Sequence, residues 1–323
     1  MDRIWNALRS QRSLLVVVAA TLAGVAYPDL AAPLQPIIPA LVAGLIFTAF
    51  YGFSFGELTS QNLSVPVVVS LACLYLVVPV ALYPVASIVL SGEVLLGVLI
   101  VLSAPVAAGS SIIWTRLGGG NTLLATVIVL VSMVLAPVVM PSLIAFFGDS
   151  GVDIAASDLV VELAAIIAVA GVFAYLVPDG TVSDGQLDGF SIAAIGALIY
   201  AGVGGSTLSV SPFDLAFVGA IAIAALCLSA GLAYALHVHG LRNDDCITVL
   251  FSSSMKNMSV SVMVGAVFGG GAVIASITAF HVAQQVVSSS LVQHLDSISP
   301  TQSSEAVTPT QSSETITTEQ LGD

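Results

Sequence analysis

The chain has 323 residues, of which 57% are hydrophobic and 8% are charged, and its mean hydropathy is +1.07. Soluble domains carry about a quarter charged residues, so this composition excludes a soluble globular protein. The net charge of −13 excludes a protein that binds nucleic acid through its phosphates. The three cysteines predict neither a disulfide framework nor a metal site. What remains is a polytopic membrane protein.

Ten hydrophobic runs, separated by short clusters of Gly, Pro, Asp and Ser, are predicted to be membrane-spanning helices. The first half of the chain holds Ser13–Tyr27, Pro33–Phe53, Val65–Tyr83, Glu93–Thr115 and Thr122–Phe147. The second half holds Ala156–Val177, Ser191–Leu208, Phe213–Leu236, Cys246–Phe268 and Ala272–Gln293. The first run is short and has a basic start, but no signal-peptidase site follows it, so we interpret it as a helix.

The arginines predict the orientation of these spans in the membrane. With ten spans they all fall on one side, which the positive-inside rule assigns to the cytoplasm. They are Arg3, Arg9, Arg12, Arg116 and Arg242. We therefore expect a multi-pass protein of the plasma membrane with both termini in the cytoplasm. Residues 297–323 contain a nine-residue repeat and few apolar side chains, and are predicted to be a disordered tail.

Two of the ten runs are interrupted by polar or helix-breaking residues where a span should be apolar. These are Ser103–Ser111 in the fourth run and Ser252–Ser259 in the ninth. Paired interrupted helices at matching positions of two halves indicate a transporter site. Since each half has five spans, the second must be inverted relative to the first. The sequence thus predicts an all-α fold of two inverted five-helix repeats, residues 1–147 and 156–293, with broken helices four and nine crossing.

The strongest candidate for a functional side chain is Lys256, the chain's single lysine, which lies inside the ninth run. A lysine at the centre of a membrane helix costs about 2.5–3.5 kcal/mol on insertion scales. A structural role, with the charge neutralised by carbonyls of the broken helices or snorkelling to a helix end, stays open. Asn257 and the neighbouring serines 252–254 and 259 accompany it, and His281 in the tenth run is followed by Gln284 and Gln285.

Other polar groups are weaker candidates. His237 and His239 are two residues apart, so their rings point to different faces of a helix. Asp244 and Asp245 are adjacent in a loop, which argues against an intramembrane aspartyl protease. Glu162 is expected to be interfacial. Without a nucleophile–base pair or metal triad at membrane depth, an enzyme is not predicted.

Taken together, the sequence resembles the bile acid/sodium symporter family of membrane transporters. The resemblance covers Arg12 to about Leu295 and depends mainly on Ser103–Ser111 with Leu135–Pro137, on Met255–Asn257 and on the stretch around His281. It implies a core domain that contains the crossed spans four and nine, and a panel domain of spans one, two, six and seven. It also implies transport of organic anions coupled to two sodium ions.

The resemblance also implies site positions, and this chain departs from the family at most of the sodium ligands. The sodium-binding Glu and Gln of span nine fall on Ser252 and Lys256, with Ser253 and Met255 completing that stretch. Other sodium ligands fall on Ser110–Ser111, Ala125, Val129 and Leu74. The substrate-binding set is then Lys256, Asn257, His281, Ser110, Ser111 and Ala108, where Ala108 replaces a threonine.

These departures predict that sodium binding is largely lost. Sodium needs several oxygen ligands, and an ammonium at the second site would repel it by about 4 kcal/mol at 4 Å. We therefore expect Lys256 to act as a tethered cation that replaces the coupling sodium, with no cofactor and with proton coupling open if Lys256 titrates. The predicted function is secondary active transport of a small organic anion by alternating access. The alternative is a transport-inactive sensor or a passive channel on the same fold, and neither the substrate nor the oligomeric state is predicted.

Overall fold

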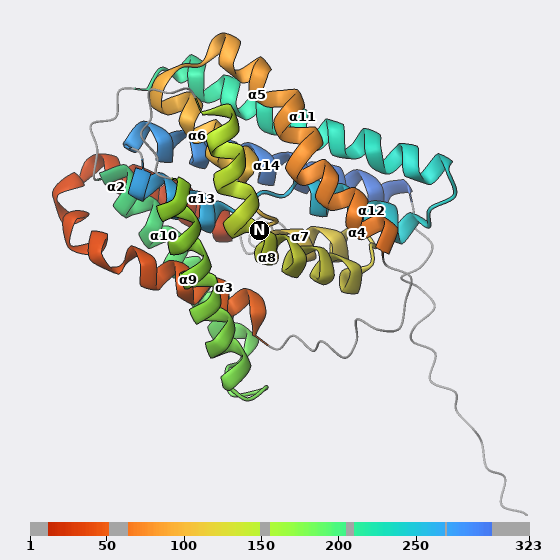
Figure 1. Cartoon of the computed structure of the whole chain (residues 1–323), viewed down its shortest axis with the longest axis horizontal. Helices are drawn as coiled ribbons and strands as arrows, with labels where there is room; N and C mark the ends of the chain where they lie inside the picture. Colours follow the sequence, from red (N-terminus) through yellow and green to blue (C-terminus); the bar gives the residue numbers. More distant parts are fainter. Residues whose placement is uncertain (1–11, 52–63, 149–155, 205–209, 269, 299–323) are drawn as a thin grey trace, which may run out of the picture.

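The computed structural model describes residues 12–51, 64–148, 156–204, 210–268 and 270–298, and it is helical almost throughout these ranges (Figure 1). The first half contains α2 (Arg12–Ala26), η1 (Pro28–Leu30), η2 (Ala32–Ile37), α3 (Ile38–Phe50), α4 (Ser64–Ala72), η4 (Cys73–Val77, a π-helical turn), α5 (Val78–Val89), α6 (Gly92–Ser103), α7 (Ala108–Leu117) and α8 (Thr122–Phe147). The second half contains α9 (Ala156–Leu176), α10 (Asp184–Gly204), α11 (Pro212–Val238), α12 (Asn243–Ser254), α13 (Met258–Phe268) and α14 (Gly271–Ile298). The all-α fold class is confirmed for this part of the chain.

Five helices within the described ranges are long and apolar enough to cross a membrane. They are Val65–Val89, Thr122–Phe147, Gly185–Gly204, Pro212–Val238 and Gly271–Val292. The pair Pro28–Leu34 and Ile38–Thr48, bent by 70°, would make a sixth. The fourth and ninth predicted runs each fall into two pieces of 10–12 residues, too short to span alone. Ten spans therefore remain a prediction, although each predicted run corresponds to helical segments.

Two helix boundaries differ clearly from the sequence prediction. The third run was expected to end at Tyr83, but α5 continues through Pro84 to Val89. The seventh was expected to begin at Ser191, but α10 already begins at Asp184. Its start is stabilised by half of a capping box, because the backbone N–H of Ser183 donates to Oε1 of Gln186 at 2.9 Å. The polar residues of its first turn carry no hydrophobic signal for a helix.

The helices form two groups that pack against each other. In one group α2 packs against α10 and α3 against α9, and these four helices lie together at the lower left of Figure 1. In the other group α14 packs against α6 and α11, and α12 lies against α4, α7, α8 and α11. The groups meet where α9 contacts α8 and where α10 contacts α13 and α14. The four helices of the first group correspond to predicted spans one, two, six and seven.

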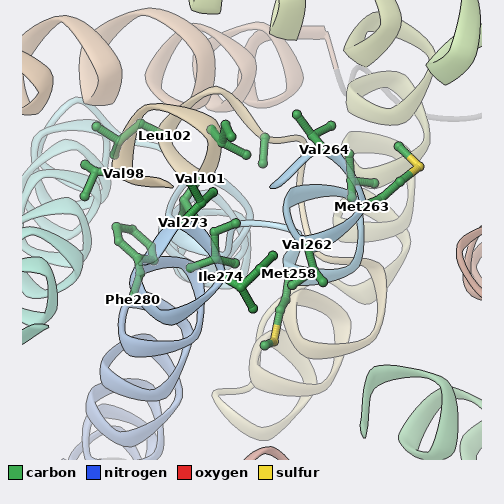
Figure 2. Packing of buried hydrophobic residues seen from close by; sticks show 14 of the residues in the cluster. Val98, Val101, Leu102, Met258, Val262, Met263, Val264, Val273, Ile274 and Phe280 are labelled. Atoms are coloured by element: carbon green, nitrogen blue, oxygen red, sulfur yellow. The ribbon is translucent and has the colours of Figure 1, made fainter. Parts of the chain in front are cut away.

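The apolar core extends across this boundary and surrounds the ends of the interrupted helices. Figure 2 shows side chains of α6, α13 and α14 meeting there, among them Leu102, Met258 and Phe280. Helices α6 and α14 approach closely at Gly97, where a Cβ atom would lie 2.7 Å from both the carbonyl oxygen of Val273 and the Cβ of Ser276. A small residue is needed at this contact. It fixes the position at which α6 reaches its break.

Candidate functional site

The two interrupted helices cross at their breaks, and the backbone of one break pairs with that of the other. Between α6 and α7 the chain is extended, and between α12 and α13 it is extended again. The N–H of Ala107 donates to the carbonyl of Met255 at 2.9 Å, and the N–H of Asn257 donates to that of Pro105 at 2.8 Å. Val106 and Lys256 thus form an antiparallel bridge. This pairing satisfies backbone groups that a broken helix would otherwise leave without partners.

The first break is caused by Pro105. Proline has no N–H to continue the helix, and it disfavours helical geometry in the preceding residue. Ala104 accordingly has an extended conformation, with φ −68° and ψ 151°. The N–H of Val106 donates to the Ser132 hydroxyl of α8 at 3.2 Å, and not to a carbonyl of α6. The α6–α7 break is therefore built from backbone and held by a neighbouring helix.

The second break contains no proline and is held by side chains. Asn257 caps α13, since its Oδ1 accepts the N–H of Val260 at 3.1 Å. Its Nδ2 donates across the crossing to the carbonyl of Val106 at 3.3 Å. The backbone N–H of Lys256 donates to Oε1 of Gln284 on α14 at 3.0 Å. These three bonds replace the helical hydrogen bonds that end at Ser254.

The Lys256 side chain is buried in the centre of the crossing, with 1% of its surface exposed. Its Nζ donates to the carbonyl oxygen of Leu102 at 2.6 Å and to that of Leu74 at 2.7 Å. It forms no ion pair with any described residue; the salt bridge found in the described ranges joins Arg242 and Asp244. Two carbonyl dipoles thus solvate the ammonium in place of water or a carboxylate.

Prolines free both of these carbonyls. The Leu102 carbonyl would normally accept an N–H three or four residues later, but Pro105 has none and the N–H of Val106 bonds to Ser132. For Leu74, the π-helical turn directs the N–H of Val78 to the carbonyl of Cys73. The residue after Val78 is Pro79, which again offers no N–H. The crossing therefore presents two helical carbonyls to one cation.

The remaining positions that the resemblance equates with sodium ligands provide few oxygen atoms. Leu74 and Val129 belong to a buried apolar cluster with Val106, and Ala125 is fully buried on α8. Ser253 is bonded to its own helix at the carbonyl of Val249. Met255 is buried, and its sulfur accepts a 3.9 Å bond from Ser288. No cluster of three His, Cys, Asp or Glu side chains suited to a metal ion occurs in the described part of the chain.

The predicted substrate-binding residues lie in two places. Ser111 is buried at the crossing, with its hydroxyl 3.3 Å from that of Ser252. Ala108 and Ser110, in the first turn of α7, are half-buried. His281 is half-buried on α14, where its Nε2 lies 3.4 Å from Nε2 of Gln285. Helix α7 thus brings small residues to the crossing, whereas His281 contacts a side chain of its own helix.

Several site residues were missed by the sequence analysis. Pro79, Ser132 and Gln284 had no assigned role, although a proline in an apolar run and a glutamine in a membrane helix are both visible signals. Gln284 is 1% exposed, and its Nε2 has no partner in the structure, while its Oε1 is fixed by the N–H of Lys256. One feature that only the fold reveals is that Leu74, 182 positions from Lys256, supplies a carbonyl.

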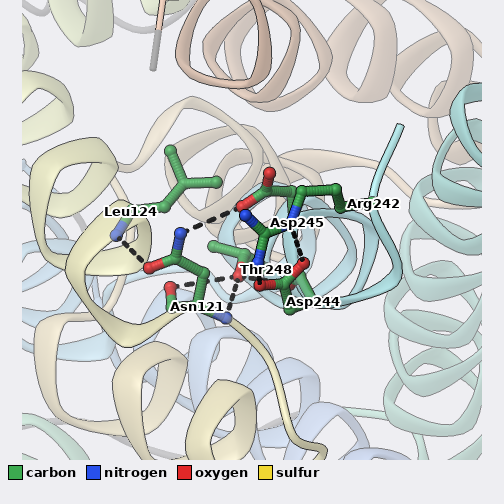
Figure 3. A network of polar contacts seen from close by, with 6 residues as sticks. All are labelled: Asn121, Leu124, Arg242, Asp244, Asp245 and Thr248. Carbon is green, nitrogen blue, oxygen red and sulfur yellow. Dashed lines mark hydrogen bonds and ion pairs between the residues drawn. The ribbon is translucent and has the colours of Figure 1, made fainter. Parts of the chain in front are cut away.

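A polar network ties the start of α8 to the start of α12 (Figure 3). The N–H of Asn121 donates to the carbonyl of Asp244 and to the hydroxyl of Thr248, and its Nδ2 donates to Asp245. Asp244 also binds Arg242 at 2.6 Å. The two acidic residues are thus engaged in holding helix ends together.

The side chain of Glu162 and residues 299–323 lie outside the described part.

The sequence match to a known family covers the first half of this site. The model of the Sodium Bile acid symporter family matches residues 53–177, which include Leu74, the first break and α8. Over these residues the chain is similar to that family. The resemblance predicted from the sequence is thereby confirmed, and this family segment supplies both carbonyls that hold Lys256. No curated protein matches the chain.

Proposed function

We propose that this membrane protein is a secondary transporter of small organic anions that works by alternating access without sodium, with Lys256 in place of the coupling cation. The observation that carries the proposal is the position of the Lys256 ammonium between the carbonyls of Leu102 and Leu74. The match of residues 53–177 to a symporter family supports transport. The tethered charge supports the loss of sodium coupling.

The chemistry of the crossing favours an ammonium over a sodium ion. Sodium would need several oxygen ligands. The resemblance implies that the family has side chains that bind sodium more strongly at the positions of Ser252, Val129 and Leu74. A second cation about 4 Å from Nζ would be repelled by about 4 kcal/mol at an effective dielectric of 20. An ammonium supplies the same charge to the same carbonyls and never dissociates from the protein.

An anionic substrate is supported by the field at the crossing. The N-termini of α7 and α13 both begin there, and the first N–H groups of a helix carry partial positive charge. The Lys256 charge is not paired with any described carboxylate. Residues 108–110, at the start of α7, are not fully buried, so a ligand can approach these N–H groups. A carboxylate or sulfate is the complementary group.

The membrane arrangement that we propose has ten spans in two inverted repeats, residues 1–147 and 156–293. Helices α2, α3, α9 and α10 would form the panel, against which the other helices move. Arg116 lies in the last turn of α7 and Arg242 precedes α12, and the bond from Asn121, at the start of α8, to Asp244 brings these two regions together. Both arginines thus lie at one end of the molecule, which supports a cytoplasmic assignment for it in the plasma membrane.

Uptake into vesicles reconstituted with the purified protein tests the proposal. A bile acid, a steroid sulfate and a small carboxylate are supplied as labelled probes, with sodium outside or with choline at equal ionic strength. We expect saturable uptake, equal in both media, and trans-stimulation by unlabelled probe inside the vesicle. Uptake that requires sodium would contradict the proposal, and flux that neither saturates nor shows trans-stimulation would indicate a channel. Faster uptake under an inward proton gradient would assign the coupling to a proton.

A further inference from the structure

A hydrogen-bonded chain of three side chains joins α14 to α7. Trp114 of α7 donates from its indole Nε1 to Oε1 of Gln285 at 2.7 Å. The other end of the same amide, Nε2 of Gln285, lies 3.4 Å from Nε2 of His281, one helical turn earlier on α14. We call these three residues the α7–α14 relay. It ends on the half-helix whose first turn lies at the crossing.

The chemistry of the three groups fixes the proton on His281. An indole N–H can only donate, so Gln285 must turn its carbonyl oxygen toward Trp114. The amide nitrogen of Gln285 can also only donate, so Nε2 of His281 must carry a lone pair. The relay in this form therefore requires a neutral His281 with its proton on Nδ1. A protonated imidazole donates from both nitrogens and does not fit.

Protonation of His281 would break the relay at one of its two bonds. If Gln285 keeps its orientation, two donors face each other between Nε2 of His281 and Nε2 of Gln285. If the amide turns over to accept from His281, its nitrogen then faces the indole N–H of Trp114. No orientation of the glutamine satisfies both neighbours, so the extra proton costs one hydrogen bond. A charged imidazolium is a stronger donor than the neutral indole, so the amide turns its oxygen to His281 and the bond that is lost is the one to Trp114.

We propose that the α7–α14 relay positions α7 against α14 only while His281 is neutral, so that protonation of His281 releases α7. His281 would then act on the crossing through Gln285 and Trp114 as a positioning residue. The inference rests on the proposed transport function for its consequence, because α7 carries the first turn at which the anion would bind. The relay itself is a property of the fold and is tested without transport.

The surroundings of His281 leave the relay as its main polar contact. The titratable residues on the elements that pack against α14 are Glu93 on α6, Arg116 on α7, Asp184, Asp188 and Tyr200 on α10, Asp214, Cys227, Tyr234 and His237 on α11, and Arg12 on α2. Most of these lie at helix ends, whereas His281 lies in the middle of α14. No described carboxylate forms an ion pair with His281. The Lys256 ammonium donates to the carbonyls of Leu74 and Leu102 instead.

The chain offers a direct optical probe of the relay, because it has two tryptophans, Trp5 and Trp114. In a Trp5→Phe variant in lipid nanodiscs, all indole fluorescence comes from Trp114, whose emission depends on the hydrogen bond of its N–H. We expect the emission maximum to shift reversibly as the pH is lowered from about 8 to about 4, with the profile of a single proton. Circular dichroism at each pH checks that the helices stay folded.

Three further variants in the same background separate the relay from other titrations. His281→Phe should lose the pH-dependent shift. Gln285→Met should give at every pH an emission close to that of the acid form, because Trp114 has no partner. Gln285→Glu should keep the neutral-form emission throughout, since a carboxylate accepts from both neighbours and a carboxylic acid can accept from one and donate to the other.

Two results would overturn the relay: a Trp114 emission that does not change over this pH range, or a shift that persists in His281→Phe. Failure of the proposed transport function would leave the fluorescence titration intact, because the measurement needs no substrate and no gradient. Conversely, transport with an unchanged Trp114 emission would reject the relay and leave the carrier standing. The two proposals therefore fail separately.

Discussion

The two breaks that cross at the candidate site are built differently. The α6–α7 break is made by Pro105 and is held by backbone bonds together with the hydroxyl of Ser132. The α12–α13 break contains no proline and, besides the same backbone bonds, is held by the side chains of Lys256, Asn257 and Gln284. One break is encoded locally, and the other depends on partners elsewhere in the chain.

This difference places the functional charge on the second break. The first break offers carbonyls, because its proline and its diverted N–H leave Leu102 without a helical partner. The second break supplies the donor, the ammonium of Lys256. Substitutions in the second break should therefore cost more stability than substitutions in the first. The unfolding temperatures of variants in the two breaks measure this difference.

The largest effect is expected for Lys256→Ala. The carbonyls of Leu74 and Leu102 would lose their donor while remaining buried, and each unsatisfied group costs about 1–3 kcal/mol. We expect a clear fall in the thermal unfolding temperature of the protein in detergent. Met255→Leu, a change of similar volume in the same break, is the matched control and should cost under about 1.5 kcal/mol. Equal losses in both variants would contradict the role of the ammonium.

A smaller effect is expected for Asn257→Ala, which removes the cap of α13 and the bond to the carbonyl of Val106. Loss of a helix cap costs about 0.5–2 kcal/mol. Asn257→Ser keeps a side-chain oxygen that can accept the N–H of Val260 and should retain part of that stability. Thermal unfolding of the two variants side by side measures the difference. An alanine variant as stable as the serine variant would show that the cap does not hold this break.

The smallest effect is expected in the first break, for Pro105→Ala. Alanine supplies an N–H but leaves the backbone pairing with Met255 and Asn257 in place, so we expect a change within about 1 kcal/mol. The unfolding temperature should stay near that of the native protein. A loss as large as that of Lys256→Ala would mean that the proline, rather than the lysine, holds the crossing.

Much of this fold could be predicted from the sequence because its signals are local. Apolar runs predicted the helical segments, and the stretch around Pro105 predicted a break through the missing N–H. The run Ser252–Ser259 predicted the second break because its polar residues sit within an apolar segment. A single buried lysine was recognisable as a candidate because its cost in a membrane is large and needs compensation.

The partners of that lysine could not be predicted. The carbonyl of Leu74 becomes available through a π-helical turn that precedes Pro79. No residue type in the sequence indicates which carbonyl will accept from the ammonium. Gln284 reaches Lys256 from a helix that is distant in sequence. The number of spans stays a prediction, because the interrupted helices are too short to qualify as spans by length and hydropathy on their own.

The dependence of thermal stability on sodium tests the tethered cation most directly. A ligand that binds only the folded state raises the unfolding temperature, so unfolding is compared in sodium chloride and in choline chloride at equal ionic strength. We predict that the native protein unfolds at the same temperature in both salts, and that Lys256→Ala regains part of its loss in sodium. A native protein that sodium stabilises specifically would show that the ion has its own site, and would contradict the replacement of that ion by Lys256.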